Sequence, residues 1–260
     1  MKTIVVISLL NLFLLPTCSK LIQYSPFDID VKTIDFNRLN INRISVESEP
    51  TSDTLKFALF ADTHENYDDM ADAIASINKL SGISFVLSAG DITSLGLASE
   101  YNWYYETALT SVHPIISCIG NHDCLSNGSI IFEKMFGHPD VSFVTGNYKF
   151  ILFNNIVWEN NNNSPRYQWL REELFQTGYH NILVFHIPPK AGELGDLHRM
   201  VYDQIVDTSN AILSLHGHFH KYEEYYHNGV RALISDAIDH REYYIISLVN
   251  KQAFIKRVIF

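Results

Sequence analysis

The chain has 260 residues, of which 47% are hydrophobic and 18% charged, enough apolar material for one large core. Its formal net charge of −10 argues against a surface that binds nucleic acid or an anionic membrane, because phosphate groups are held mainly by clustered Lys and Arg. No internal repeat is visible. We therefore expect one main domain and no nucleic-acid polymer among its partners.

Residues 1–18 predict a secretory signal peptide. A single basic residue precedes an apolar run, Ile4 to Leu15, which ends at Pro16. The run is too short to cross a bilayer comfortably, which takes about 20 residues, and its layout is typical of an export signal. The sequence Leu-Pro-Thr-Cys at 15–18 also resembles a bacterial lipobox, although its middle residues match poorly. We expect export to the cell envelope, periplasm or outer surface and a membrane anchor of lipid at Cys18; the alternatives are a plain signal peptide cut elsewhere and an uncleaved N-terminal anchor.

Residues 19–54 are polar without a clear period, and we expect a tether and an irregular lead-in there. Over 55–260 apolar runs alternate with helical patterns, as in a sheet covered by helices. Strands are predicted at Leu55–Ala61, Ser84–Ala89, Pro114–Ile119, Ser142–Thr145, Lys149–Asn154, Asn181–Phe185 and Ala211–Leu215. Helices are predicted at Tyr67–Leu80, Ala98–Thr110 and Pro165–Gln176, the last with Ser164 as its cap and Gly178 just past its end. Three further runs, Val230–Ile234, Tyr243–Val249 and Ala253–Ile259, predict antiparallel strands, with a turn at Asn250-Lys251 between the last two.

Two cysteines, Cys118 and Cys124, remain beyond Cys18. Cys118 lies in an apolar run that predicts a buried strand, where Cys behaves as a small hydrophobe. In an oxidising compartment the two thiols could form a bridge. We expect two free, buried thiols, and a disulfide is the alternative.

Five short motifs begin where predicted strands end. They are Asp62-Thr63-His64, Gly90-Asp91, Gly120-Asn121-His122-Asp123, His186 and Gly217-His218-Phe219-His220. Taken singly, an Asp after a strand is more often a helix cap, Gly-Asp a turn and a lone His a core residue. Together they should meet at the carboxyl edge of one sheet, where open α/β sheets place their ligands. Their Asp, His and Asn side chains form the mixture needed to hold two metal ions side by side.

In this order the motifs resemble those of the calcineurin-like metallophosphoesterase superfamily, from about Leu55 to at least Ile234. The resemblance implies an α/β (α+β) fold, a four-layer αββα sandwich of two mixed sheets flanked by helices, with a dinuclear metal site at the carboxyl edge of the strands. It further implies two sets of metal ligands that share Asp91 as a bridge: Asp62, His64, Asp91 and His220 for one ion, and Asp91, Asn121, His186 and His218 for the other. Fe, Mn, Zn and Ni all tolerate such N/O sites, so the identity of the metals stays open.

Two metal ions about 3.5 to 4 Å apart can bind phosphate oxygens and lower the pKa of a bridging water for in-line attack, so no protein nucleophile is required. His122 alone among the motif histidines has no metal role. We expect it to contact the substrate as an acid or as a charge partner of the leaving oxygen, with Asp123 orienting its ring.

The motif style is most similar to the class III cyclic nucleotide phosphodiesterase group, because Ile187-Pro188-Pro189 follows His186 and the third motif ends in Asp123. The Tyr that purple acid phosphatases carry three residues after the Asp corresponding to Asp91 is absent, as is the longer Gly-Asp-x-Val-Asp-Arg-Gly of protein phosphatases. We expect a hydrolase of small phosphate esters, a phosphodiesterase. The alternatives are a phosphomonoesterase or nucleotidase on the same fold and a non-catalytic metal-binding scaffold.

Substrate selection should come from the loops. Trp158, in the polar loop 157–164, could stack on a substrate or simply pack within the loop. Lys190, His198 and Arg199 could meet a second phosphate or could be solvated surface charge. His216 is expected to be a strand residue, and the oligomeric state is not indicated.

Overall fold

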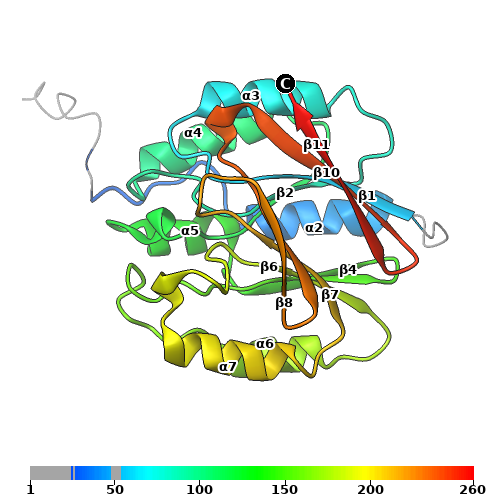
Figure 1. The fold of residues 1–260 in the computed structure, drawn as a ribbon. Helices are drawn as coiled ribbons and strands as arrows, with labels where there is room; N and C mark the ends of the chain where they lie inside the picture. Colours follow the sequence, from blue (N-terminus) through cyan, green and yellow to red (C-terminus); the bar gives the residue numbers. More distant parts are fainter. Residues whose placement is uncertain (1–24, 26, 48–53) are drawn as a thin grey trace, which may run out of the picture.

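The computed structural model describes residues 25, 27–47 and 54–260, so the predicted signal peptide and lipobox lie outside the described residues. Two mixed sheets pack face to face, with helices on both outer sides (Figure 1). This four-layer arrangement confirms the fold class expected from the motifs. Among the described residues, no helix has the length and apolarity needed to cross a membrane.

The first sheet has five strands in the order β11-β10-β1-β2-β3. Its members are β1 (Thr54–Phe60), β2 (Val86–Ser88), β3 (Ile115–Ser117), β10 (Glu242–Val249) and β11 (Gln252–Ile259). The strands β1, β2 and β3 are parallel, and the hairpin β10–β11 is added to β1 in antiparallel register.

The second sheet has six strands in the order β4-β5-β6-β7-β9-β8. They are β4 (Val141–Thr145), β5 (Tyr148–Leu152), β6 (His180–Val184), β7 (Ala211–His216), β8 (Glu223–His227) and β9 (Val230–Ile234). The four central strands are parallel, and the edge strands β4 and β8 are antiparallel to their neighbours.

Successive side chains of a strand point to opposite faces of its sheet and so contribute to two different core layers. In β1, Phe57 and Leu59 face the second sheet, whereas Ala58 and Phe60 face the helices, as the period of two in a strand requires. The outer face of the first sheet is covered by α3 (Tyr67–Ile77), α4 (Ala98–Ala108) and α5 (Gly128–Phe136), and that of the second by α6 (Tyr167–Leu174) and α7 (Asp196–Val206).

Helix α2 (Phe36–Glu47) corrects the expectation of an irregular lead-in over residues 19–54. Its sequence lacks a clear apolar stripe, and tertiary hydrogen bonds hold it instead. The buried Asn37 side chain donates to the Ser117 carbonyl at 2.8 Å and accepts from the Ser117 amide at 2.9 Å, which pairs backbone groups at the outer edge of β3, the last strand of its sheet. A pattern search based on apolar periodicity therefore could not detect this helix.

The strand positions are confirmed within a few residues, including the turn between β10 and β11. The antiparallel orientation predicted for Val230–Ile234 is right only on one side, because β9 is antiparallel to β8 and parallel to β7. One prediction about their arrangement is wrong: the motif-bearing strands do not share one sheet, because β1, β2 and β3 lie in the first sheet and β6 and β7 in the second. The predicted start of α6 at Pro165 is also wrong, since Arg166 occupies the cap position and the helix begins at Tyr167. The sequence analysis missed α5, α7 and β8. The expectation of two free, buried thiols is confirmed for Cys118 and Cys124.

Candidate metal centre

The carboxyl ends of β1, β2, β3, β6 and β7 meet where the two sheets face each other, and all seven predicted metal ligands follow these ends. Two groups of side chains there have ligand atoms that all lie within 4.8 Å of one another: Asp62, His64 and His220, and Asp62, Asp91 and His186. The predicted ligands therefore follow strands of two different sheets, and the fold places those of the two groups in one cluster.

In the first group the imidazoles point at each other. The Nε2 atoms of His64 and His220 are 3.2 Å apart, and His220 Nε2 is 3.3 Å from Asp62 Oδ1. Asp62 is fully buried at the end of β1, and both its oxygens accept the backbone N–H of His218 at 3.0 Å. The loop after β7 is thus fastened to the end of β1.

The second group is buried throughout. His186 Nε2 lies 3.1 Å from Asp91 Oδ2 and 3.9 Å from Asp62 Oδ1. Asp91 Oδ2 is also 3.8 Å from His64 Nε2, and its other oxygen accepts the His122 backbone N–H at 2.9 Å. Both carboxylates consequently lie between imidazoles of the two groups.

Asn121 and His218 adjoin the second group. Asn121 Oδ1 is 3.1 Å from His218 Nδ1, and the His218 ring stands edge to face against His186 with ring centroids 5.2 Å apart. Asn121 and His218 each also meet a carboxylate from a loop, Glu159 at 3.5 Å and Glu193 at 3.9 Å. Sequence reasoning missed both glutamates, because no periodicity or motif marks them.

These residues fit metal ions. His186 Nδ1 donates to the Ala89 carbonyl at 2.8 Å, so in the neutral ring the lone pair is on Nε2. Nε2 is buried and has no partner in hydrogen-bonding geometry among the described residues, although two carboxylates lie nearby. Lone pairs facing one another in this way are satisfied by cations, and imidazole nitrogen with carboxylate and amide oxygen suits transition metals.

The electrostatics of the cluster favour positive charge. Burial acts to raise the pKa of Asp91, but the positive charge and the hydrogen bond of His186 outweigh burial and hold that pKa at about 2. Burial likewise acts to lower the pKa of His186, and Asp91 and Asp62 raise it to about 10. A metal ion takes the place of such a proton when ligands bind it. Burial lowers the pKa of His64 and of His218, which keeps both rings in the neutral, metal-binding form.

Five of the seven predicted ligands have left-handed backbone torsions, with φ between 47° and 79°: Asp62, His64, Asp91, His218 and His220. Such residues cost of order 1 kcal/mol or more each and persist only where the surroundings hold them. Here Asp62 N–H donates to the Gly90 carbonyl at 3.0 Å, and His64 N–H to the Asp91 carbonyl at 2.9 Å. The first two motif loops therefore hold each other in the strained form that aims their side chains inward.

Two motif glycines leave room for the carboxylates. A Cβ on Gly120 would lie 2.1 Å from Asp91 Oδ1, and a Cβ on Gly217 would lie 2.5 Å from Asp62 Oδ2. Neither position has a positive φ, so close approach is the reason for glycine at both.

His122 stands beside the cluster. Its Nδ1 donates to the Ser94 carbonyl at 2.8 Å, and its ring meets His64 edge to face with centroids 4.7 Å apart. The Ser94 carbonyl, and not Asp123, therefore orients this ring, which corrects the role expected for Asp123.

Asp123 is fully buried and accepts four hydrogen bonds of 2.8 to 3.2 Å, from the amides of Gly120, Ile92 and Thr93 and from the Thr93 hydroxyl. Burial and the negative charge of Asp91 raise the pKa of Asp123 to about 7, although the hydrogen bonds that it accepts act to lower this pKa. Asp123 joins the loop after β2 to the loop after β3, and so positions Asp91 and Asn121.

The remaining candidates are engaged elsewhere. Lys190 pairs with Glu223 at 2.5 Å, Arg199 pairs with Asp196, and His198 Nδ1 lies 3.2 Å from the Tyr167 hydroxyl. These partners favour the surface-charge interpretation over a second phosphate site. His216 is a buried residue of β7, as expected, and Trp158 projects from its loop.

Comparisons with known proteins agree with this geometry. A sequence profile of the calcineurin-like phosphoesterases matches residues 55–222, and the chain belongs to this family of hydrolases. A search of curated protein sequences found no match.

Three solved structures illustrate the likeness of fold. A dimetal phosphatase from Danio rerio is 11% identical, with a TM-score of 0.64 over 78% of this chain and 95% of that one. GAP50, the anchor in the inner membrane complex of Plasmodium, is 11% identical, with a TM-score of 0.58 over 79% and 84%. The NAD nucleotidase of Haemophilus influenzae is 13% identical, with a TM-score of 0.53 over 78% of this chain and 49% of that one. At these identities the likeness concerns the fold.

Proposed function

We propose that this chain is a dinuclear metal-dependent phosphodiesterase. Asp62, His64, Asp91 and His220 would hold one ion, and Asp91, Asn121, His186 and His218 the other. Asp91 is the preferred bridge because its Oδ1 is taken by the His122 amide, which directs Oδ2 toward the imidazoles of both groups. Both oxygens of Asp62, in contrast, share the His218 amide.

When bound, the two ions would supply the charge that binds phosphate oxygens and lowers the pKa of an attacking water. The protein groups then have separate tasks. His122 donates its Nδ1–H to the Ser94 carbonyl, so only the imidazolium form carries a second proton, on Nε2, which it would give to the leaving oxygen. Asp123 keeps Asp91 and Asn121 in place through the loops that it joins.

The observation that carries the preference for diesters is the acidic rim, which we define as Glu65, Glu159 and Glu193. Glu159 and Glu193 contact Asn121 and His218, and Glu65 accepts a hydrogen bond from Ser94, whose carbonyl holds His122. A monoester carries about two negative charges near neutral pH and a diester one, so carboxylates at the rim penalise the monoester more.

A matched pair of substrates tests this proposal. The chain, reconstituted in turn with Mn²⁺, Zn²⁺, Fe²⁺ and Ni²⁺, is assayed on bis(nitrophenyl) phosphate and on nitrophenyl phosphate. We expect a higher kcat/KM on the diester, and E159Q/E193Q should raise monoester turnover relative to diester turnover. A preference for the monoester would favour the phosphomonoesterase or nucleotidase alternative. Two bound metals without turnover of either ester would favour the scaffold.

We also propose export with a lipid anchor at Cys18, which rests on the sequence of residues 1–18. The full-length protein should partition into detergent, and Cys18→Ala should release it or block its processing. Mass spectrometry that finds an unmodified mature N-terminus at another residue would contradict this proposal.

A further inference from the structure

A polar cavity of about 240 Å³ lies at the edge of the second sheet that also carries the metal centre. Asn154 follows the end of β5, and Asp140 precedes β4, which runs antiparallel to β5. Both residues line the cavity, together with Glu133 of α5 and with Asn160 and Arg166 from the loop between β5 and α6. We call this cavity the polar pocket.

The polar pocket adjoins the second group of ligands. Ile119, which lines the pocket, lies two residues before Asn121. Asn160 follows Glu159, whose carboxylate is 3.5 Å from the Asn121 side chain. Neighbouring strands are about 4.8 Å apart, so the end of β5 lies one strand spacing from the end of β6, which His186 closely follows. A group bonded to a phosphate at the metal centre is therefore within reach of the pocket.

The polar pocket offers hydrogen-bond donors. Asn154 Oδ1 accepts the Ile156 amide at 3.0 Å, and its Nδ2 has no partner in the part of the chain that the structure describes. His138 Nδ1 accepts the Asp140 amide at 3.0 Å, so this ring is neutral and carries its proton on Nε2. Arg166, which can only donate, faces that Nε2 at 3.0 Å. An oxygen atom that accepts from both groups would satisfy these two donors.

The polar pocket also offers acceptors. Among the described residues, the Glu133 carboxylate and the Asn160 side chain make no hydrogen bond or ion pair. Asp140 is buried, and its two oxygens are occupied: one accepts the Asn154 amide at 2.7 Å, and the other lies 3.6 Å from Arg166. The wall thus mixes donors with acceptors and carries charges of both signs.

This wall discriminates among the groups that a phosphate ester can carry. A second phosphate would meet the carboxylates of Glu133 and Asp140. A nucleobase is commonly held by stacking, and none of the described lining residues is Phe, Tyr or Trp. An acyl chain needs an apolar wall, whereas only Ile119 and two prolines are apolar here. Hydroxyl groups donate, accept and carry no charge, so a sugar ring matches the wall.

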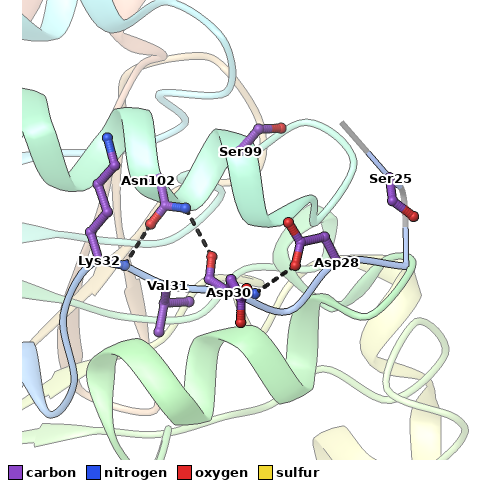
Figure 2. A pocket seen from close by; sticks show the side chains of 7 residues that line it. All are labelled: Ser25, Asp28, Asp30, Val31, Lys32, Ser99 and Asn102. Carbon is purple, nitrogen blue, oxygen red and sulfur yellow. Dashed lines mark hydrogen bonds between the residues drawn. The ribbon is translucent and has the colours of Figure 1, made fainter. Parts of the chain in front are cut away.

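The cavity beside the N-terminal segment differs in this respect. It has a volume of about 330 Å³ and lies between residues 25–32 and α4 (Figure 2). Asn102 donates to the Asp30 carbonyl at 2.9 Å and accepts from the Lys32 amide at 2.8 Å. Asp28 accepts the Asp30 amide at 3.0 Å. These bonds hold the segment on the helix, so the packing of the segment accounts for that cavity.

We propose that the polar pocket binds a sugar ring of the substrate, so that the substrate class is a phosphodiester of a sugar. This inference rests on the proposed function, because it places the phosphorus at the metal centre. It adds a specificity-determining site to the same reaction. Water attacks the phosphorus and one P–O bond breaks as before, while Asn154, Asn160 and Arg166 bind the sugar hydroxyls.

Two diesters of equal charge and with the same leaving group test the pocket: glucose 6-(nitrophenyl phosphate) and methyl nitrophenyl phosphate. With the metal-reconstituted chain, we expect kcat/KM to be about 10-fold or more higher on the glucose diester, because two or three hydrogen bonds contribute about that much. Asn160→Ala should lower this ratio several-fold. Asn154→Asp keeps the oxygen that accepts the Ile156 amide and removes the Nδ2 donor, so it should lower the ratio as well.

Asn161→Gly is the matched control. Asn161 is exposed, does not line the pocket and has a left-handed φ of 57°, which glycine adopts without strain. Its ratio of the two kcat/KM values should equal that of the wild type. A wild-type ratio near one, or a ratio that Asn160→Ala and Asn154→Asp leave unchanged, would overturn the proposal. A preference for thymidine 5′-(nitrophenyl phosphate) over the glucose diester would overturn it in favour of a nucleoside.

Calorimetry separates this inference from the proposed reaction. Glucose 6-(methyl phosphate) and dimethyl phosphate are titrated into the reconstituted wild type and into Asn160→Ala. The wild type should bind the glucose ester about 10-fold more tightly or better, and Asn160→Ala should lose most of this difference. If neither nitrophenyl ester is turned over, the proposed function fails, and the two affinities still decide the pocket. Equal affinities of the wild type for the two methyl esters would overturn the sugar site.

Discussion

Gly120→Ala should disable the site through a single added carbon. The new Cβ would lie 2.1 Å from Asp91 Oδ1 and 2.3 Å from the Asp91 amide, whereas ordinary contacts begin at 3.4 Å. The backbone of Asp91 cannot easily yield, because its carbonyl accepts the His64 amide and the next two amides donate to Asp123. The new Cβ meets both the carboxylate and the backbone of Asp91, so the Gly120 loop and the Asp91 carboxylate must move apart by about 1 Å. A displacement of that size costs about 100-fold in rate.

The assay is kcat/KM on bis(nitrophenyl) phosphate, with the metal content measured on the same sample. We expect a loss of about 100-fold or more and weaker metal binding, while overpacking lowers the free energy of unfolding by only about 1–3 kcal/mol. Gly192→Ala is the matched control, because a Cβ there meets nothing within 4 Å. Wild-type turnover and metal content in Gly120→Ala would refute the reasoning.

Three further predictions concern His122, Asp123 and His216. His122→Ala should keep both metals and lose about 10²–10⁴-fold on an alkyl diester but much less on a nitrophenyl diester, because an alkoxide leaving group needs a proton; equal losses would contradict the acid role. Asp123→Ala should reduce turnover of both esters alike and weaken metal binding, since it acts through loop positions; a loss confined to the alkyl diester would show that Asp123 acts through the His122 ring. His216 has its pKa lowered by burial from 6.5 to about 3, so the unfolded state binds the extra proton between these values. Stability should therefore be lost as pH falls from 6.5 toward 3, by up to about 5 kcal/mol, and urea unfolding of His216→Gln at pH 7 and 4.5 should show a smaller loss than the wild type; the same pH dependence in both would contradict this.

The strands and the ligand residues were predictable because both signals are local. Apolar runs mark β1, β2, β3, β6 and β7, and each motif directly follows one of them. The meeting of two sheets at one edge was not readable from these runs, since strand order depends on long-range pairing such as that of β1 with β10. The left-handed torsions of the ligands arise from bonds between loops and leave no mark in the sequence.

A side chain's role could be predicted less well from its neighbour in the sequence. Asp123 follows His122 directly, which suggested that the two side chains pair. Both lie in a 3₁₀ turn (His122–Cys124), in which successive side chains diverge by about 120°. The carboxylate turns into the protein and the imidazole toward the site. Glu159 and Glu193 lie in irregular loops, so only the folded structure shows that they contact Asn121 and His218.

The central claim is that this chain holds two metal ions that share Asp91. Elemental analysis combined with native mass spectrometry of the reconstituted wild type and of Asp91→Asn tests it most directly. The wild type should carry two metals per chain, and Asp91→Asn, which removes the anionic ligand shared by both ions, should lose at least one of them together with its turnover. Two metals per chain and undiminished turnover in Asp91→Asn would contradict the account.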